Sequence, residues 1–127
     1  MRIFVLEDSP ERHKKFRREL VGHHLDMVET VEEGRELIKE KYDLMFLDHD
    51  LGGEIFVPSG EGTGYEMAKL IAESVNKNSA IIIHSCNHAG STAMGFHLLC
   101  AQRIPFVSLD IEAALVWAEE YKKHERI

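Results

Sequence analysis

The chain has 127 residues, enough for one domain to bury a hydrophobic core without disulfide bonds. Its formal net charge of −7 argues against broad binding to nucleic acid or to an anionic membrane surface. The sequence shows no apolar run long enough to span a membrane, no signal-peptide pattern and no CxxC pair between Cys86 and Cys100. These features predict a cytoplasmic protein with reduced thiols, organised as a single domain over residues 1–127.

The first elements in chain order alternate between strand and helix. The apolar run Arg2–Leu6 predicts a buried strand, and the segment Ser9–Leu20 begins with a capping serine and a first-turn proline that favour a helix. Alternating residues over Leu25–Glu29 predict a half-buried strand. The segment Thr30–Glu40 opens with a capping box and predicts a second helix.

The middle of the chain repeats this alternation around a long loop. Asp43–Leu47 is nearly continuously apolar, which is typical of a strand covered on both faces. A glycine-rich loop follows over residues 51–62. A second capping box opens a helix over residues 63–75, in which Val75 is the last residue of the apolar periodicity. Ala80–Ile83 predicts another buried strand.

The last third contains two helices and a strand. Ala89–Ala101 predicts a helix that Gly95 weakens. Ile104–Val107 predicts a final strand, and Pro105 within it suits an edge position because proline lacks an N–H group. Asp110 is a suitable N-cap for the last helix.

Five strands alternating with five helices predict an α/β fold of three layers, a doubly wound parallel sheet with helices on both faces. The second and fifth strands are the least apolar, which suits edge positions and the strand order 2-1-3-4-5. In such a sheet the ligand crevice lies outside the carboxyl ends of the strands, at the switch point between the first and third. The polar residues of the sequence gather at these ends.

Acidic residues follow two strands that are neighbours in this order. Glu7 and Asp8 end the first strand, and Asp48 ends the third. Carboxylates brought together repel unless they are protonated or share a cation, and Mg²⁺ prefers oxygen ligands of this kind. We therefore expect these three residues to hold a divalent ion, with Asp48 as metal ligand or phosphoryl acceptor. The alternative is that the acids cap helix N-termini.

Three segments give the chain a resemblance to the receiver domains of two-component response regulators, over essentially its whole length. They are Leu6-Glu7-Asp8, Asp43-Leu44-Met45-Phe46-Leu47-Asp48 and Ile81-Ile82-Ile83-His84-Ser85.

The resemblance implies a role for each matching position. Glu7 and Asp8 would hold Mg²⁺, Asp48 would be the phosphorylated aspartate, and Ser85 would contact the phosphate. Phe106 would match the switch aromatic of the fifth strand. Receivers carry a lysine three residues after this aromatic, whereas this chain has leucine at position 109. Because that lysine pairs with the phosphoryl group, its loss argues against ordinary phospho-switching.

Two histidines stand where receivers carry apolar or variable residues. His49 follows Asp48, and His84 precedes Ser85. Histidine exchanges protons near neutral pH, so this pair predicts acid–base catalysis beside a bound phosphate. The alternatives are a buried core histidine at position 84 and a solvent-facing one at position 49. The set Asp48-His49-Asp50 with His84-Ser85-x-Asn87 resembles the cyclic-phosphate processing receiver domains, a group proposed to act as phosphoesterases on cyclic phosphate termini, including those of RNA.

The leading hypothesis is a metal-dependent phosphoesterase that acts on a small phosphoester or cyclic phosphate. Asp48, His49, His84 and Ser85 would be catalytic, with Ser85 and Asn87 binding phosphate. Mg²⁺ is the expected ion and Mn²⁺ or Zn²⁺ are alternatives, since the spacing His84-x-Cys86-x-His88 also offers zinc ligands.

Two further functions stay open. One is a stand-alone signalling receiver that a sensor kinase phosphorylates on Asp48. The other is a degenerate receiver that binds a partner without chemistry. The leucine at position 109 disfavours the signalling function, and the paired histidines favour the enzyme over the binding module.

Overall fold

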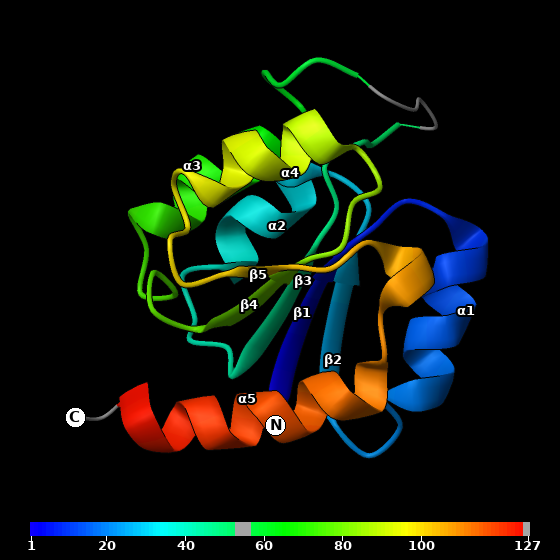
Figure 1. The fold of residues 1–127 in the computed structure, drawn as a ribbon, viewed down its shortest axis with the longest axis vertical. Coiled ribbons are helices and arrows are strands. Elements are labelled where there is room, and N and C mark those ends of the chain that lie inside the picture. The colour runs from blue at the N-terminus through cyan, green and yellow to red at the C-terminus, as the bar shows by residue number, and fades with distance from the viewer. Residues whose placement is uncertain (53–56, 126–127) are drawn as a thin grey trace.

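The computed structural model describes residues 1–52 and 57–125 (Figure 1). The predicted loop at 51–62 therefore lies partly outside the described residues. In chain order the elements are β1 (Arg2–Leu6), α1 (Pro10–Glu19), β2 (His24–Val28), α2 (Val31–Leu37), β3 (Leu44–Leu47), α3 (Gly64–Ala72), β4 (Ala80–Ile83), α4 (His88–Gly95), β5 (Gln102–Arg103), the 3₁₀-helix η1 (Phe106–Ser108) and α5 (Ile111–Glu125). Within this part of the chain, no helix has the length and apolar character needed to cross a bilayer.

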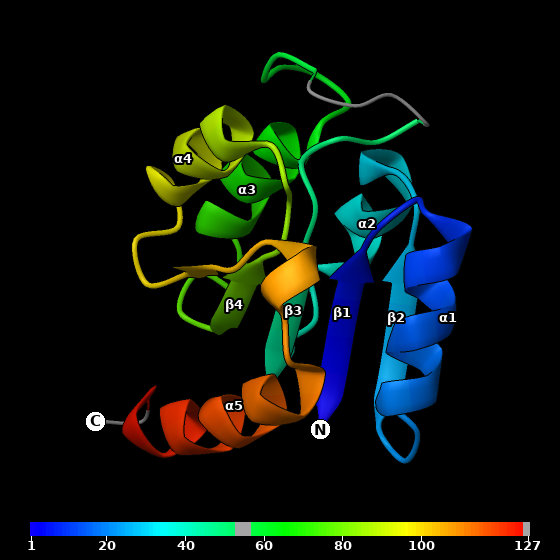
Figure 2. The same ribbon diagram turned by 45° about the vertical axis from the view of Figure 1, so that its right-hand side comes forward.

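The strands form one parallel sheet in the order β2-β1-β3-β4-β5, which confirms the predicted fold. Figures 1 and 2 show the strands running side by side between two layers of helices. Pairing in register brings the ends of β1, β3 and β4 together, because Leu6 pairs with Leu47 and Leu47 with Ile83. The residue that follows each of these three strands therefore lies at the same edge of the sheet.

The core has two parts, one on each face of the sheet. Side chains such as Phe4 and Leu6 pack with α2, α3 and α4, whereas Ile3 and Val5 pack with α1 and α5. This division follows from the period of two along a strand, which sends successive side chains to opposite faces. Both faces of the central strands are apolar because both are covered by helices.

The fifth strand differs from its predicted bounds. β5 covers Gln102–Arg103, whereas Ile104–Val107 was expected. Its pairing with β4 continues only through single bonds, from the Ile104 N–H to the Ile83 carbonyl and from the Phe106 N–H to the His84 carbonyl, each 2.9 Å long. Pro105 between them has no N–H to donate, and the chain then turns into η1.

Three helices end before their predicted bounds, and the first is α2, which ends at Leu37 instead of Glu40. α3 ends at Ala72, and Val75 is 60% exposed instead of lying in the core. Ser74 ends the helix by donating its hydroxyl to the Ile71 carbonyl at 2.8 Å. The segment beyond is held by the fully buried Asn76, which accepts a hydrogen bond from a backbone N–H and donates to two carbonyls.

α4 begins one residue before the prediction and ends at Gly95, not at residue 101. Asn87 caps it, because its side-chain oxygen accepts a hydrogen bond from the Gly90 N–H at 2.9 Å. Glycine favours helical geometry less than other residues, and the helix ends where it occurs.

Gly64 brings the start of α3 against the end of β3. Its N–H donates to the His49 carbonyl at 2.8 Å, and a Cβ atom at this position would lie 1.9 Å from the Asp48 carbonyl oxygen. Only a residue without a side chain allows the two backbone segments to approach this closely.

We expect Gly64→Ala to lower the free energy of unfolding by about 3 kcal/mol, because a backbone atom cannot move aside as a side chain can. Urea unfolding measures the loss. Gly60→Ala is the matched control, since a Cβ there meets nothing within 4 Å. Equal stability of the two variants would contradict the close approach.

Candidate functional site

Three polar side chains meet at the carboxyl edge of the sheet. Glu7, Asp48 and His84 directly follow β1, β3 and β4, and one ligand atom from each lies within 4.8 Å of the others. Each stands two residues after a strand side chain that faces α1 and α5, so all three continue on that face. The structure thus brings together residues that are up to 77 positions apart in the chain.

Glu7 is only 1% exposed and carries a dense set of hydrogen bonds. Its Oε1 accepts from the His84 ring at 2.9 Å and from Arg12 at 3.2 Å, and its Oε2 accepts from the Asp8 and Ser9 N–H groups at 3.0 and 3.1 Å. Burial alone would raise the pKa of Glu7, but these donors overcome it and lower the pKa to about 2. Glu7 is therefore a carboxylate.

His84 is fully buried, and its ring packs against three phenylalanines, Phe16, Phe46 and Phe106. Burial lowers the pKa of His84, so the ring is neutral and donates its Nε2–H to Glu7. Its Nδ1 is buried without a hydrogen-bond partner among the described residues. The ring is thus held by one polar contact and an apolar cage, which orients the Glu7 carboxylate.

Asp48 is the carboxyl group whose ionised form the surrounding residues stabilise least. It is 5% exposed, and burial together with the negative charge of Glu7 raises the pKa of Asp48 to about 8. The His49 N–H, which donates to Oδ1 at 2.9 Å, only partly offsets this. Two adjacent buried carboxylates fit a divalent cation, which would neutralise the pair, and their oxygen atoms suit Mg²⁺ or Mn²⁺.

Arg12 belongs to the site although the sequence analysis did not single it out. Its Nη1 lies 3.2 Å from Glu7 Oε1 and 4.0 Å from Asp48 Oδ2, and its guanidinium stacks 4.6 Å above the Phe106 ring. The sequence feature that could have identified Arg12 is its position in the first turn of α1, the helix that follows β1, because side chains there reach the carboxyl edge of the sheet.

His49 lies outside this group. Its Nδ1–H donates to Asp50 Oδ1 at 2.7 Å, and its Nε2 accepts from the Ser59 hydroxyl at 2.9 Å. The ring is fully buried and so close to α4 that a Cβ on Gly90 would lie 2.4 Å from it. The two histidines therefore do not share a pocket, because His49 comes one residue after Asp48 and points to the opposite face. Nor is His49 the solvent-facing residue of the alternative interpretation.

The other predicted site residues flank the group. Asp8 is half-buried beside Glu7 and is not one of the three residues that meet there. Ser85, 3% exposed, accepts a hydrogen bond from the Asn87 N–H at 3.0 Å. The Asn87 amide donates to Asp50 at 3.0 Å and to the Val57 carbonyl at 3.1 Å, so it ties the long loop to α4.

The zinc spacing does not assemble a site among the described residues. Cys86 and His88 are exposed, whereas His84 is fully buried with its ring directed at Glu7. The metal-ligand group that the described residues form contains neither Cys86 nor His88.

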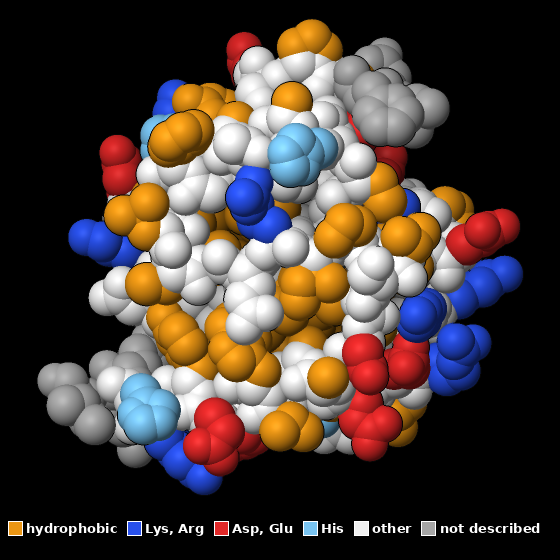
Figure 3. Space-filling view, viewed as in Figure 1, with side chains coloured by type: hydrophobic (Ala, Val, Ile, Leu, Met, Phe, Trp, Pro, Cys, Tyr) orange, Lys and Arg blue, Asp and Glu red, His pale blue; other side chains and the backbone are white. Residues whose placement is uncertain are grey.

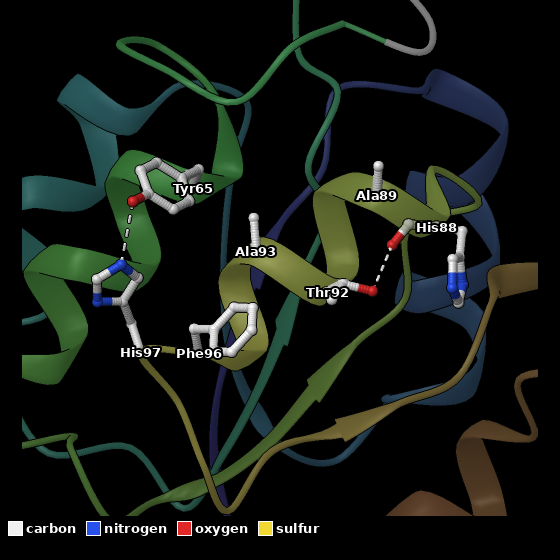
Figure 4. A pocket seen from close by; sticks show the side chains of 7 residues that line it. All are labelled: Tyr65, His88, Ala89, Thr92, Ala93, Phe96 and His97. Carbon is white, nitrogen blue, oxygen red and sulfur yellow. Dashed lines mark hydrogen bonds between the residues drawn. The ribbon is translucent and has the colours of Figure 1, made fainter.

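A separate hollow of about 650 Å³ lies over α3 and α4, and Glu7, Asp48 and His84 are not part of its lining (Figure 4). The figure shows the Tyr65 hydroxyl and the His97 ring facing each other, with a hydrogen bond of 3.1 Å between them. Its lining is Tyr65, His88, Ala89, Thr92, Ala93, Phe96 and His97. Because it is mostly apolar and has no carboxylate, it does not offer a second metal site.

Residues 2–100 match the family model of the cyclic-phosphate processing receiver domain. The chain belongs to this family. No curated protein matches it. Among solved structures, this receiver domain is similar to a receiver domain protein (CheY-like) from Methanospirillum hungatei JF-1, with 17% identity, a TM-score of 0.74 and 97% of each chain covered.

Two other solved receivers have the same fold. TrrA from Thermotoga maritima, solved in complex with Mg²⁺-BeF, is 23% identical with a TM-score of 0.67, over 94% of this chain and 97% of that one. Response regulator Rcp1, solved in its Mn²⁺-bound form, is 14% identical with a TM-score of 0.64, over 93% of this chain and 88% of that one. Likeness at these identities establishes the fold of the receiver domain and leaves the activity to its own residues.

The raised pKa of Asp48 makes the stability of the metal-free protein depend on pH. The folded protein keeps the proton up to a pH of about 8, whereas the ordinary pKa is 3.8. Between these values the folded state binds more protons than the unfolded state, so its free energy of unfolding falls as the pH rises. We expect a weaker pH dependence over this range in Asp48→Asn. Urea titrations in EDTA measure it, and equal slopes would contradict the assignment.

We expect His49→Ala to lower the free energy of unfolding by about 2–4 kcal/mol, because it removes two hydrogen bonds and leaves a gap beside Gly90. The affinity of the folded variant for Mn²⁺ should stay unchanged, since the ring lies outside the metal-ligand group. Calorimetric titration measures this affinity, with the exposed His97→Ala as control. A large loss of Mn²⁺ binding in folded His49→Ala would show that the ring reaches the site.

Proposed function

We propose that this receiver domain is a metal-dependent phosphoesterase that acts on a small or cyclic phosphate, with cyclic phosphate termini of RNA among the candidate substrates. The observation that carries the proposal is the burial of Glu7 and Asp48 side by side, which places two negative charges where only a cation or a proton relieves them. The family description, which names cyclic-phosphate processing, supports the substrate class.

Glu7 and Asp48 would hold the ion, and Asp8 would complete the ligand set from the neighbouring position. Structures of similar receivers support the choice of ion, because TrrA was solved with Mg²⁺ and Rcp1 with Mn²⁺. A divalent ion bound here would supply positive charge to the phosphate oxygens and favour attack at phosphorus.

The histidine and the hydroxyl would have different tasks. His84 donates one hydrogen bond, to Glu7, and its surroundings are apolar, so it would set the orientation of that carboxylate. Ser85 follows His84 in the chain, and contact between its hydroxyl and the phosphate stays a prediction, because the small hollow that Ser85 lines contains none of Glu7, Asp48 and His84. Asn87 and His49, which hold the loop segment at Val57–Ser59, would keep it over this edge; direct catalysis by His49 stays a prediction.

The interior position of Leu109 disfavours the signalling function. The side chain is 5% exposed and belongs to the core on the α1 and α5 face. It therefore provides neither a charge nor a hydrogen bond for a phosphoryl group on Asp48, which phospho-switching by a sensor kinase would require.

We expect wild-type protein with Mg²⁺ or Mn²⁺ to hydrolyse an oligoribonucleotide that ends in a 2′,3′-cyclic phosphate, and EDTA to stop the reaction. Asp48→Asn should lower the rate about a hundredfold because it removes a charge that holds the ion. Glu119→Gln, which removes an exposed carboxylate on α5, is the control. The same assay on His84→Ala and His49→Ala tests both histidines.

Equal background hydrolysis by wild type and His84→Ala would count against the enzyme. A mass increase on Asp48 after incubation with a small phosphodonor would favour the signalling function instead.

A partner-binding function is the second candidate, and one observation favours it. Large hydrophobic side chains are exposed around the end of α4, η1 and α5, and Figure 3 shows orange side chains gathered on the face that these elements form. They are Phe96 at 75%, Leu99 at 85%, Val107 at 84% and Val116 at 64% exposure. If the protein neither binds a divalent ion nor hydrolyses a cyclic phosphate, partner binding through this exposed face becomes the favoured function.

A further inference from the structure

Among the arginines and lysines of the described residues, Arg12 forms ion pairs with both buried carboxylates, Glu7 and Asp48. None of the roles proposed above uses Arg12. The positive charge of Arg12 matters because of the net charge of the metal ion and its ligands. A divalent ion held by ionised Glu7 and Asp48 is neutralised by them, and Asp8 in the ligand set would add a further negative charge, so the ion and its ligands together have no net positive charge with which to attract a phosphate dianion. A further cation is needed at the site.

We infer that Arg12 is the anion-binding residue of this site and contacts the non-bridging oxygens of the phosphate that the metal ion holds. The inference rests on the proposed function, and it adds a residue for substrate recognition. Leu109, where a receiver would carry lysine, is buried in the core and leaves this role unfilled.

The contacts of Arg12 leave part of its guanidinium available. Nη1 donates to Glu7 at 3.2 Å, whereas the hydrogen bond that Nη2 makes within the described part of the chain is to the sulfur of Cys86, at 3.7 Å. Sulfur is a weak acceptor, and a guanidinium has five N–H donors in a planar fork that matches two phosphate oxygens. The side chain is 26% exposed, so an incoming phosphate reaches it from solvent.

Phe106 holds the guanidinium through a cation–π contact. The guanidinium stacks 4.6 Å above its ring, and the same ring packs against His84 with centroids 6.0 Å apart. Phe106 therefore positions Arg12 on one side and the histidine that orients Glu7 on the other. Binding at this geometry requires little reorganisation of the side chain.

Calorimetry with two probes tests the inference. Mn²⁺ alone is titrated first, and inorganic phosphate is then titrated into the Mn²⁺-saturated protein. We expect Arg12→Gln to bind phosphate about tenfold or more weakly, because it loses a charge-assisted hydrogen bond. Its Mn²⁺ affinity should be unchanged or higher, since a competing cation leaves Glu7. Arg12→Lys should bind phosphate with intermediate affinity.

Lys15→Gln is the matched control, because Lys15 lies on the same helix and its Nζ sits 5.2 Å from the same Phe106 ring. This variant should bind Mn²⁺ and phosphate like wild type. An equal loss of phosphate binding in Lys15→Gln and Arg12→Gln would show that any nearby positive charge has the same effect, and it would overturn the inference.

The remaining outcomes separate this inference from the proposed function. Wild-type protein that binds no Mn²⁺ would defeat both. Mn²⁺ binding with wild-type phosphate affinity in Arg12→Gln would overturn the inference and leave the phosphoesterase standing. Loss of Mn²⁺ binding in Arg12→Gln would show that Arg12 only positions the carboxylates, which also overturns it.

Discussion

The burial of two carboxylates next to each other is the constraint on which the rest of the site depends. Neighbouring negative charges out of contact with water destabilise a fold, so each needs a compensating group. Glu7 finds it in the neutral His84 ring, two backbone N–H groups and Arg12. Asp48 has fewer donors and keeps a proton to a higher pH. This asymmetry makes Asp48 the position that a bound cation changes most.

The scaffold achieves this arrangement with ordinary sheet geometry. Parallel strands end at one edge, and the order β1-β3-β4 places three of those ends side by side. Side-chain alternation then sorts the residues that follow each strand. Glu7, Asp48 and His84 share the face covered by α1 and α5, and His49 faces α4 and holds the long loop. A polar site and a structural anchor thus come from adjacent residues of one segment.

The particular successes and failures of the sequence analysis have physical reasons. Apolar runs and capping residues predicted the order of the elements well, because both are local signals. The bounds of β5 and the end of α3 were wrong, since they depend on Pro105 and Ser74 competing with a periodic apolar pattern. Arg12 was missed because its importance comes from Glu7, Asp48 and Phe106 together, and two of these are distant in the chain.

What the amino-acid sequence by itself determined is the parallel α/β fold and the edge of the sheet that carries polar residues, because hydrophobic periodicity and strand order follow from local pattern and chain connectivity. Only the tertiary structure decided which polar residues meet. Whether a histidine contacts a carboxylate or a loop serine depends on the face to which its side chain points and on the elements packed there. Strand alternation sets the face of each histidine, but the partner that it meets there comes from residues far apart in the chain, which no local pattern encodes.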